Sequence, residues 1–435
     1  MSAAKVSHGV TETRREDSAS VRTSAVPSLR FKGFESAWIS KELLEIVTFG
    51  KGRGYSKSDI KESGTPLFLY GRMYTAFQNE VASVDTFTNA VEGSVLSKGK
   101  EVVVPASGET AEDIARASAI TSEGIILGGD LNVLTPKNGV DINSVFLALV
   151  LSYGRARKQI EVRAQGKTVV HVHNTDLAEV MPSYPVCLDE QEKIQIGFRN
   201  VDTALLSRQS ALAKLQALKK SMLVNMFPQG DAKVPKIRFK GFEGVWEGVR
   251  LGDEGHTYNG LSGKTSADFG HGAGKYVTYM NVFINPISKE GQCESVEIDK
   301  RQNEVRPGDV FFTISSETPD EVGMSSVWLS SGKNTYLNSF CFGYRPHREI
   351  DSKFLAYLLR SMSFREKVVK LAQGISRFNI SKGKVMDIHI LMPEKEEQVK
   401  IGEYFYSLDR LIAARRDEIE QLKHMKAALL NRMFV

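Results

Sequence analysis

Two segments of the chain carry a heptad pattern of apolar positions, spaced in alternating steps of three and four. In the first segment these positions are Ile194, Phe198, Val201, Leu205, Leu212, Leu215, Met222 and Met226. In the second segment they are Ile401, Phe405, Leu408, Ile412, Ile419, Leu422, Leu429 and Met433. Since each pattern lasts for more than four heptads, the spacing predicts two long helices that pair as a coiled coil.

Charged residues interrupt both apolar seams. Arg208 and Lys219 do so in the first segment, and Arg415 and Lys426 in the second. A long cationic side chain in a seam can extend to the rim and reach water. Alternatively, such charges fix the register and orientation of the two helices. The pattern alone leaves both interpretations open.

The segments before the two helices show the shorter period of strands. Runs such as 101–104 and 309–313 are rich in valine and phenylalanine, and one helix is expected in each half, over 145–162 and 353–371. Such mixtures of short strands with a helix are typical of α+β domains. Prolines at 182–185 and at 393 precede the long helices, and the Pro228 to Gly230 stretch closes the first one.

These two halves are copies of one plan. The run Val26–Glu35 returns 208 residues later as Val234–Glu243, and Trp38 then matches Trp246. The same order is kept by Ala-Gln-Gly at 164–166 and 372–374 and by the Glu-Gln pairs that open the long helices. A single large offset indicates a duplication with internal pseudo-two-fold symmetry rather than a solenoid.

The repeat divides the chain into five expected segments. Residues 1–25 are predicted to be a disordered tail, 26–185 a first globular domain (the first head), 186–230 the central long helix with its linker, 231–391 a second globular domain (the second head), and 392–435 the C-terminal long helix. Two antiparallel helices would carry the heads to opposite ends. A helix over 189–227 would span about 58 Å at a rise of 1.5 Å per residue.

Composition narrows the function classes. The 57 Lys+Arg against 52 Asp+Glu give a net charge of +5, which permits nucleic-acid binding without requiring it. The three scattered cysteines fit a reducing cytoplasm and no disulfide framework. No apolar stretch approaches the roughly 18 residues of a membrane span. We therefore expect a cytoplasmic protein without a membrane partner.

Motifs for catalysis are missing. The Gly-Lys-Thr strings at 166–168 and 263–265 lack the earlier glycine of a phosphate loop, and His171 and His173 have no further zinc ligands nearby. No nucleophile elbow, paired-carboxylate motif or HExxH is present. The sequence favours a non-enzyme that binds no cofactor or metal. A fused, unrecognised DNA methyltransferase or nuclease remains the alternative.

The segments between the matching blocks differ between the copies, so specificity is expected there. Cations, hydroxyls and aromatic rings in these segments could hold phosphates and read base edges, although a solvated loop is the alternative for each residue. The DNA-binding candidates are Lys51, Arg53, Tyr55, Lys57, Arg72 and Tyr74 in the first head, and Tyr258, Asn259, Lys264, Lys275, Tyr276 and Asn281 in the second.

A second candidate surface is the repeated loop at 166–171 and 374–379. Glycine there would let a phosphate approach the backbone, and Lys167 and Arg377 would neutralise its charge. A purely structural turn is the alternative. Because the two heads differ, the expected DNA target consists of two unlike half-sites with an unread spacer, about one helical turn apart.

From Val26 to Val435 the chain resembles the specificity subunit of type I restriction-modification systems. The resemblance is carried by the doubled Phe-Lys-Gly-Phe-Glu-x-x-Trp entry, the strand at 308–312, the Ala-Gln-Gly loops and the Glu-Gln-x-x-Ile helix openings. It departs from the family pattern in the first head, where Lys100-Glu101 stands in place of Gly308-Asp309 and Lys167-Thr168 replaces a small-hydroxyl pair.

The resemblance implies two target-recognition domains that read a bipartite asymmetric site in double-stranded DNA, and two long helices that set the spacer. It also implies two methyltransferase (modification) subunits, which use S-adenosylmethionine. Up to two restriction subunits, with ATPase and endonuclease activity that uses ATP and Mg²⁺, complete the expected complex.

Overall fold

The computed structural model describes residues 22–23, 26–166 and 168–434. This part of the chain forms two compact units: one contains the residues up to Leu206 together with those from Glu420 onward, and the other contains Ser207–Ile419. Over the described ranges, no helix combines the length and the apolar character that crossing a membrane requires.

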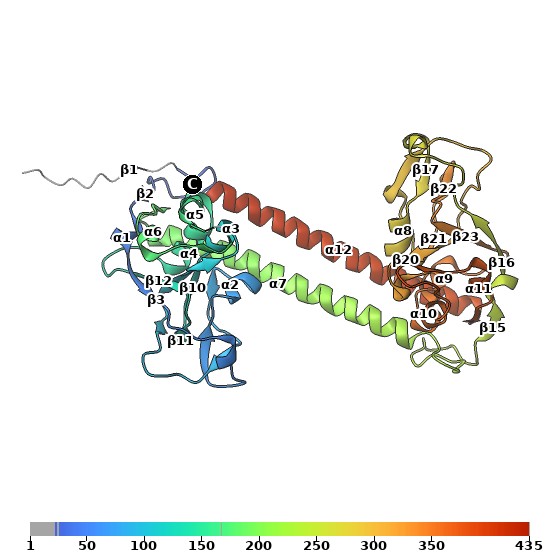
Figure 1. Ribbon diagram of the computed structural model, residues 1–435, viewed down its shortest axis with the longest axis horizontal. Helices are drawn as coiled ribbons and strands as arrows, with labels where there is room; N and C mark the ends of the chain where they lie inside the picture. Colours follow the sequence, from blue (N-terminus) through green and yellow to red (C-terminus); the bar gives the residue numbers. More distant parts are fainter. Residues whose placement is uncertain (1–21, 24–25, 167, 435) are drawn as a thin grey trace, which may run out of the picture. The chain divides into compact units, whose positions relative to one another are not determined.

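The α+β class and the two long helices are confirmed. Helix α7 covers Leu188–Asn225 and helix α12 covers Lys395–Met433, drawn green and red in Figure 1. The predicted disordered tail lies outside the described residues except for Arg22 and Thr23. These two form strand β1, which pairs with β2 (Ile39–Ser40), so the prediction of disorder is wrong for them.

The first head is built on two sheets. A five-stranded sheet has the order β3 (Val47–Lys51), β12 (Leu131–Pro136), β8 (Glu101–Pro105), β10 (Ser118–Ile120) and β5 (Glu80–Val81). A four-stranded sheet has the order β6 (Phe87–Thr88), β4 (Thr65–Phe68), β11 (Glu123–Leu127) and β7 (Leu96–Lys98). Because side chains alternate along a strand, Val102 and Val104 of β8 join one buried cluster and Val103 joins another.

The second head repeats this plan. Its four-stranded sheet has the order β16 (Gly255–Asn259), β23 (Cys341–Pro346), β19 (Val310–Thr313) and β21 (Ser325–Val327). Its three-stranded sheet has the order β18 (Cys293–Val296), β17 (Phe269–Val277) and β22 (Thr335–Leu337). Strand β19 alternates as β8 does, with Val310 and Phe312 in one cluster and Phe311 in another.

Short elements complete the heads. The short helices are α1 (Leu43–Ile46), α2 (Arg72–Thr75), α3 (Ala111–Ile114), α6 (Asn174–Ala178), α8 (Tyr279–Ile284) and α11 (Lys382–Met386). The short strands are β9 (Ser107–Gly108), β13 (Val170–His171), β14 (Ser183–Tyr184), β15 (Glu247–Arg250), β20 (Ser315–Ser316), β24 (Phe378–Asn379) and β25 (His389–Met392). Single 3-10 turns lie at Lys57–Asp59, Leu251–Asp253, Ser266–Asp268, Glu290–Gln292 and Pro319–Glu321.

The prediction of a single helix over 145–162 and over 353–371 is wrong, because each of these segments forms two helices. The first head has α4 (Ser144–Ser152) and α5 (Gly154–Arg163), and the second has α9 (Ser352–Leu358) and α10 (Met362–Val369). Gly154 adopts a φ of +67°, and a Cβ there would lie 3.0 Å from that of Phe434. In the second head Ser361 donates its hydroxyl to the Leu358 carbonyl at 2.6 Å, which competes with the helix.

Each head packs against the beginning of one long helix and the end of the other. In the first unit Phe198 of α7 and Phe434 after α12 join the core, with ring centroids 5.7 Å apart. In the second unit Phe405 of α12 and Phe227 after α7 do the same at 5.8 Å. Since the beginning of one helix meets the end of the other in both units, the helices are antiparallel, as predicted.

A buried ion pair explains why two distant motifs recur in both copies. Arg30 donates to both carboxylate oxygens of Glu190, at 2.5 and 2.7 Å, and Arg238 donates to those of Glu397, both at 2.7 Å. The glutamate side chains are 1% and 0% exposed. Hydrogen bonding to the glutamate raises the pKa of each arginine. The repeated entry motif is therefore locked to the opening of the long helix.

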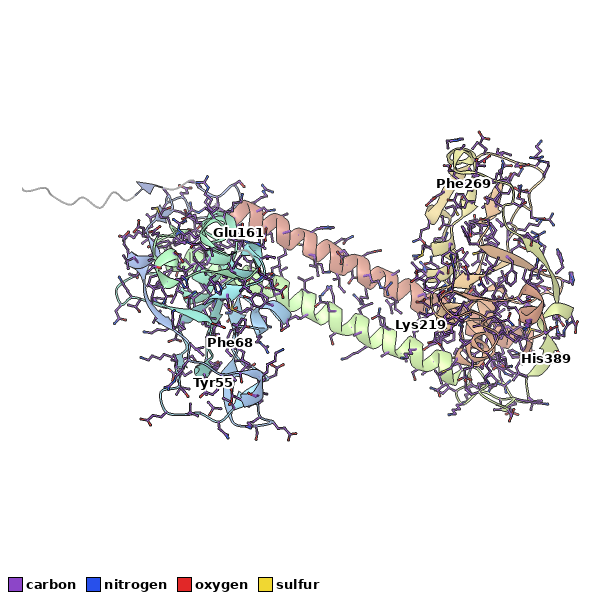
Figure 2. The ribbon with its side chains drawn as sticks, viewed as in Figure 1. Tyr55, Phe68, Glu161, Lys219, Phe269 and His389 are labelled. Atoms are coloured by element: carbon purple, nitrogen blue, oxygen red, sulfur yellow. The ribbon has the colours of Figure 1, made fainter. Side chains whose placement is uncertain are left out.

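The charges in the apolar seam form ion pairs between the helices. Lys219 (labelled in Figure 2) contacts Asp409 at 2.5 Å, and Lys426 contacts Asp202 at 2.6 Å. Arg208 lies 3.3 Å from Glu418, which also pairs with Arg415 on its own helix at 2.6 Å. These pairs favour the interpretation that seam charges fix the register, because each cation has an acid on a defined turn.

Candidate nucleic-acid interface

In the first head the predicted cations are clustered after β3 but are not equivalent. Lys51 and Lys57 are exposed, and neither makes an ion pair within the described part of the chain. The guanidinium of Arg53 instead donates to the Glu92 carbonyl at 2.7 Å. The hydroxyl of Tyr55 bonds to that of Ser94 at 2.5 Å. Arg53 and Tyr55 therefore bind the neighbouring loop, and Lys51 and Lys57 are the available charges.

Arg72 and Tyr74 lie on α2 and have internal partners. Arg72 pairs with the exposed carboxylate of Asp85. The hydroxyl of Tyr74 donates to the Ser107 carbonyl at 2.5 Å, and the guanidinium of Arg116 lies 5.9 Å from its ring centroid. Burial raises the pKa of Tyr74. The hydroxyl of Tyr74 is therefore used to hold β9 in place and is not free to bind a ligand. Lys167 lies outside the described residues.

Tyr258 is a correction to the predicted interface, because it is only 8% exposed. Its hydroxyl donates to Asp309 Oδ2 at 2.7 Å, and Arg345 donates to both oxygens of Asp309 at 2.7 Å. The Arg345 guanidinium also lies 5.1 Å from the Tyr258 ring centroid. Burial, followed by the negative charge of Asp309, raises the pKa of Tyr258. A Cβ at Gly343 would lie 2.2 Å from the tyrosine ring, so this strand must carry glycine there.

Asn281 and Lys264 are also less available than the sequence suggested. Asn281 is 1% exposed, and its amide donates to the Lys289 carbonyl and accepts from the Lys289 amide, at 2.8 and 2.9 Å. Lys264 lies between Asp299 and Asp268, at 3.3 and 3.6 Å, with 11% of its side chain exposed. Asn281 as a DNA contact is therefore wrong, and a phosphate would have to displace two carboxylates from Lys264.

The other candidates of the second head stay at the surface. Lys275 is half exposed and lies 3.4 Å from Glu290, and Asn259 accepts from Lys382 at 2.8 Å. Tyr276 donates to Glu294 at 2.6 Å, and burial raises its pKa to about 12. These side chains can still meet a ligand at β16 and β17, so their assignment as DNA contacts remains a prediction.

In each head an antiparallel bridge closes the repeated glycine loop, Gln165 with His171 and Gln373 with Asn379. Strand β13 also pairs with β9, and β24 with β20, although these partners are distant in the sequence. A Cβ at Gly166 or Gly374 would lie 1.9 or 2.0 Å from the carbonyl oxygen of Val169 or Arg377, and both glycines have positive φ. The glycine is thus required by the turn itself, which is the structural alternative. Arg377 nevertheless projects from this turn and is exposed.

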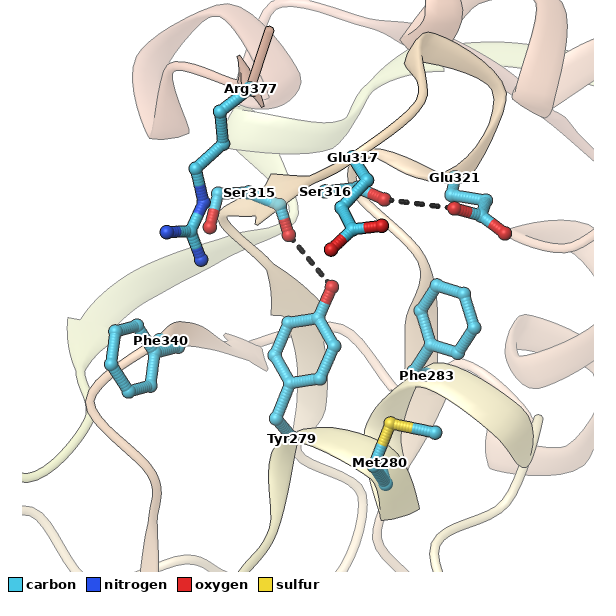
Figure 3. A pocket seen from close by; sticks show the side chains of 9 residues that line it. All are labelled: Tyr279, Met280, Phe283, Ser315, Ser316, Glu317, Glu321, Phe340 and Arg377. Carbon is cyan, nitrogen blue, oxygen red and sulfur yellow. Dashed lines mark hydrogen bonds between the residues drawn. The ribbon is translucent and has the colours of Figure 1, made fainter.

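Sequence reasoning missed a cavity of about 380 Å³ beside Arg377. Figure 3 shows Arg377 and Phe340 on one side of Tyr279 and Phe283 on the other, with Glu317 at the rim. The repeat did contain a signal, since Ser315 and Glu317 match Ser107 and Glu109. That match indicated a shared frame and gave no hint of a cavity.

Comparisons with known proteins agree on one family. The family model described as "Type I restriction modification DNA specificity domain" matches residues 246–424. The MjaVIII specificity subunit of Methanocaldococcus jannaschii is 25% identical over 301 residues, covering 66% of this chain and 70% of that protein. The EcoKI specificity subunit of Escherichia coli (strain K12) is 30% identical over 138 residues, covering 30% of this chain and 29% of that protein.

Solved structures share the fold. The type I restriction-modification S subunit from M. genitalium superposes with a TM-score of 0.58 at 15% identity, over 94% of this chain and 99% of that one. A chain from a study of complex assembly in a type I system gives 0.52 at 16% identity, over 91% and 97%. Residues 246–424 therefore match the type I restriction-modification DNA specificity domain, and the chain shares the fold of solved type I S subunits.

Proposed function

We propose that this chain is a DNA specificity subunit and that each of its heads reads one half of a bipartite, asymmetric site in double-stranded DNA. The observation that carries the proposal is a common frame beneath two different surfaces. Arg30–Glu190 and Arg238–Glu397 anchor the heads through the same bidentate ion pair. The exposed cations that could contact DNA, in contrast, differ between the heads. They are Lys51 and Lys57 in the first head and residues at other sequence positions, such as Arg377, in the second. Two unlike readers on one frame fit two unlike half-sites.

The long helices are proposed to set the unread spacer and to dock two methyltransferase subunits and up to two restriction subunits. The support for docking comes from apolar side chains that the long helices leave exposed, because an apolar groove at the surface is typical of an interaction site. They include Ile196, Leu206, Leu218, Val399, Leu411 and Met425, which are 38–57% exposed. A groove of about 550 Å³ runs along α12 between Phe239, Tyr404 and Leu411.

The chain itself is proposed to be non-catalytic and to act in the cytoplasm. S-adenosylmethionine would bind the methyltransferase subunits, and ATP and Mg²⁺ the restriction subunits. The absence of cofactor motifs from the sequence supports this division of labour. The alternative, an unrecognised methyltransferase or nuclease within the chain, predicts activity without partners.

The direct test is to incubate DNA and labelled S-adenosylmethionine with the pure chain and, separately, with the chain plus its methyltransferase subunit. We expect labelled DNA only in the second mixture, at one bipartite motif. Methyl transfer by the isolated chain would support the enzyme alternative. DNA binding should also weaken steeply as the salt concentration rises, because phosphates that the protein neutralises release their counterions. An affinity that does not change with salt concentration would contradict any contact with phosphates.

The spacer proposal has its own test. Inserting four residues into each long helix, near Lys214 and Gln421, adds at most about 6 Å of rod at 1.5 Å per residue. At about 3.4 Å per base pair the spacer should lengthen by one or two base pairs, and we expect one. The readout is the methylated motif from cells that carry a folded complex. An unchanged spacer would contradict the idea that the helices set it.

A further inference from the structure

The cavity beside Arg377 has an aromatic wall and a charged rim. Tyr279 and Phe283 lie one turn apart on α8 with their rings stacked at 5.8 Å, and Phe340, 59% exposed, forms the opposite side. Arg377 and Glu317 bring a guanidinium and a carboxylate to the same opening (Figure 3). The cavity therefore offers a fork of donors, an acceptor and apolar surface within one small space.

The frame around this cavity is rigid. The hydroxyl of Tyr279 donates to the Ser315 carbonyl at 2.7 Å, which ties α8 to β20. Strand β20 in turn pairs with β24, directly after Arg377. The side chain of Thr278 accepts from the amide of Asn281 at 3.2 Å and caps α8. Because these bonds fix the backbone on three sides, the charged side chains extend from defined positions.

Arg377 and Glu317, the two charged residues at the rim, differ from the other predicted DNA contacts of the second head in their lack of internal partners within the described residues. Lys264 and Lys275 both have carboxylate partners. Within the described ranges, neither Arg377 nor Glu317 makes a side-chain hydrogen bond or an ion pair, and both are exposed. A ligand can therefore engage both groups without displacing an internal partner.

The cavity carries one positive and one negative side chain, and this combination decides between a contact with a phosphate and a contact with a base edge. A phosphate would be attracted by Arg377 but repelled by the carboxylate of Glu317 at the same opening. A base pair edge carries acceptors and donors side by side. In the major groove guanine presents two acceptors, O6 and N7, which match an arginine fork, and cytosine presents the N4 amino donor, which matches a carboxylate.

We propose that this cavity reads a G·C pair in the half-site of the second head, with Arg377 donating to guanine and Glu317 accepting from cytosine. The inference rests on the proposed DNA-reading function and adds a base identity to it. Once a base pair covers the opening, the apolar surface of Tyr279 and Phe340 would shield the charged pair from water and so strengthen its discrimination. The aromatic residues act by positioning, and Arg377 and Glu317 touch the DNA.

The first head has the frame of this cavity without its donor. Tyr74 donates to the Ser107 carbonyl as Tyr279 does to that of Ser315, and Glu109 matches Glu317. The position that matches Arg377 is Val169. The first head therefore lacks the arginine fork, and G·C reading at this place belongs to the second head alone.

The test compares Arg377→Ala, Arg377→Lys and Glu317→Gln in the full complex, with Glu109→Gln in the first head as the matched control. The readouts are the methylated motif from cells and competition binding with single-base substitutions, after thermal melting has shown that each variant folds. We expect both Arg377 variants and Glu317→Gln to relax one G·C position of a single half-site. Discrimination there should fall roughly 5- to 150-fold, and Glu109→Gln should leave that half-site unchanged.

Several outcomes would overturn the inference. If Arg377→Ala weakens binding to every sequence alike and Arg377→Lys restores it, Arg377 is a phosphate contact. A half-site of the second head without any G·C pair, or one unchanged in all variants, would also refute it, while a bipartite motif would still stand for the proposed function. If the parent complex methylates no defined motif, the proposed function fails first.

Discussion

The two heads can be compared at an acidic residue at the start of matching strands, since Glu101 is the first residue of β8 and Asp309 directly precedes β19. In the first head Glu101 Oε2 accepts the backbone amides of Lys98 and Lys100 at 2.9 and 3.2 Å. In the second head Asp309 accepts the amide of Arg306 at 2.8 Å and also binds the side chains of Tyr258 and Arg345. Both acids are buried. The turn contact is thus common to both heads, whereas the side-chain triad belongs to one.

The difference separates what the fold requires from what each head can vary. Glu101 departs from the family pattern in sequence, yet its longer side chain still reaches a turn amide three residues earlier. The strand register places Gly50 and Thr135 where the second head has Tyr258 and Arg345, so the first head has a glycine and a threonine in place of the tyrosine and the arginine. The frame is therefore kept by contacts with the backbone, and side-chain networks vary around it.

The largest predicted effect is on the shared frame. Replacing Glu190 or Glu397 with alanine leaves a mostly buried arginine without its partner, which should lower the free energy of unfolding by about 3–5 kcal/mol in each case. Similar shifts in the urea midpoint are expected for both, because the bidentate ion pair is the same in both heads. Lys423→Ala, in an exposed pair within α12, is the control and should not shift the midpoint. A large effect at only one glutamate would break the equivalence of the frames.

The next effect should distinguish the heads. Tyr258→Phe removes a buried hydrogen bond to a carboxylate and should cost about 1.5–3 kcal/mol, whereas Tyr74→Phe removes a bond to a neutral carbonyl and should cost about 0.5–1.5 kcal/mol. Urea or thermal unfolding measures both. If the two variants lose equal unfolding free energy, or if Tyr74→Phe loses more, the Tyr258–Asp309–Arg345 triad gives the second head no additional stability.

A smaller difference is expected between the seam ion pairs. Lys219→Met and Lys426→Met each remove a partly exposed pair between the helices, which should cost up to about 1 kcal/mol. Lys219→Met should cost more, because the Lys219 ammonium also lies 5.6 Å from the Tyr357 ring centroid and the variant loses this contact as well. If instead both variants are as stable as the parent and keep its motif spacing, the seam charges do not fix the register.

The smallest effects concern surface cations and should appear in DNA binding without a change in stability. Lys57→Ala should reduce the slope of log K against log salt by about 0.9, the value for one phosphate contact. Lys275→Ala should change it less, since Lys275 has Glu290 as an internal partner. Titrations at several salt concentrations measure both slopes. A steeper loss at Lys275 would reverse this order of the two heads.

The sequence predicted the shared frame of the two heads because the residues that form its contacts recur in both copies of the repeat. The heptads located α7 and α12 closely, and the doubled entry motif marked residues that meet the openings of these helices. It did not predict the break at Gly154, since Phe434, which packs there, is distant in the chain. It also missed the burial of Tyr258, because that depends on Asp309 and Arg345, which β19 and β23 bring to it.

For the candidate site the sequence identified the side chains but not their partners. Lys264, in a diverged segment, and Arg377, in the repeated glycine loop, looked alike as cations that could bind DNA. The fold places Asp299 against Lys264 and leaves Arg377 open beside a cavity. Such pairing depends on loops that approach each other across the sheet, which a single sequence without periodic signal does not encode.

The central claim, one half-site for each head, is tested most directly by exchanging the first head. Residues 40–180 would be replaced with the corresponding segment of another family member, with Arg30, Glu190 and both long helices left intact, and the methylated motif would be sequenced from cells. The account predicts a new first half-site, with the second half-site and the spacer unchanged. A change in both half-sites, or in the spacer alone, would contradict it.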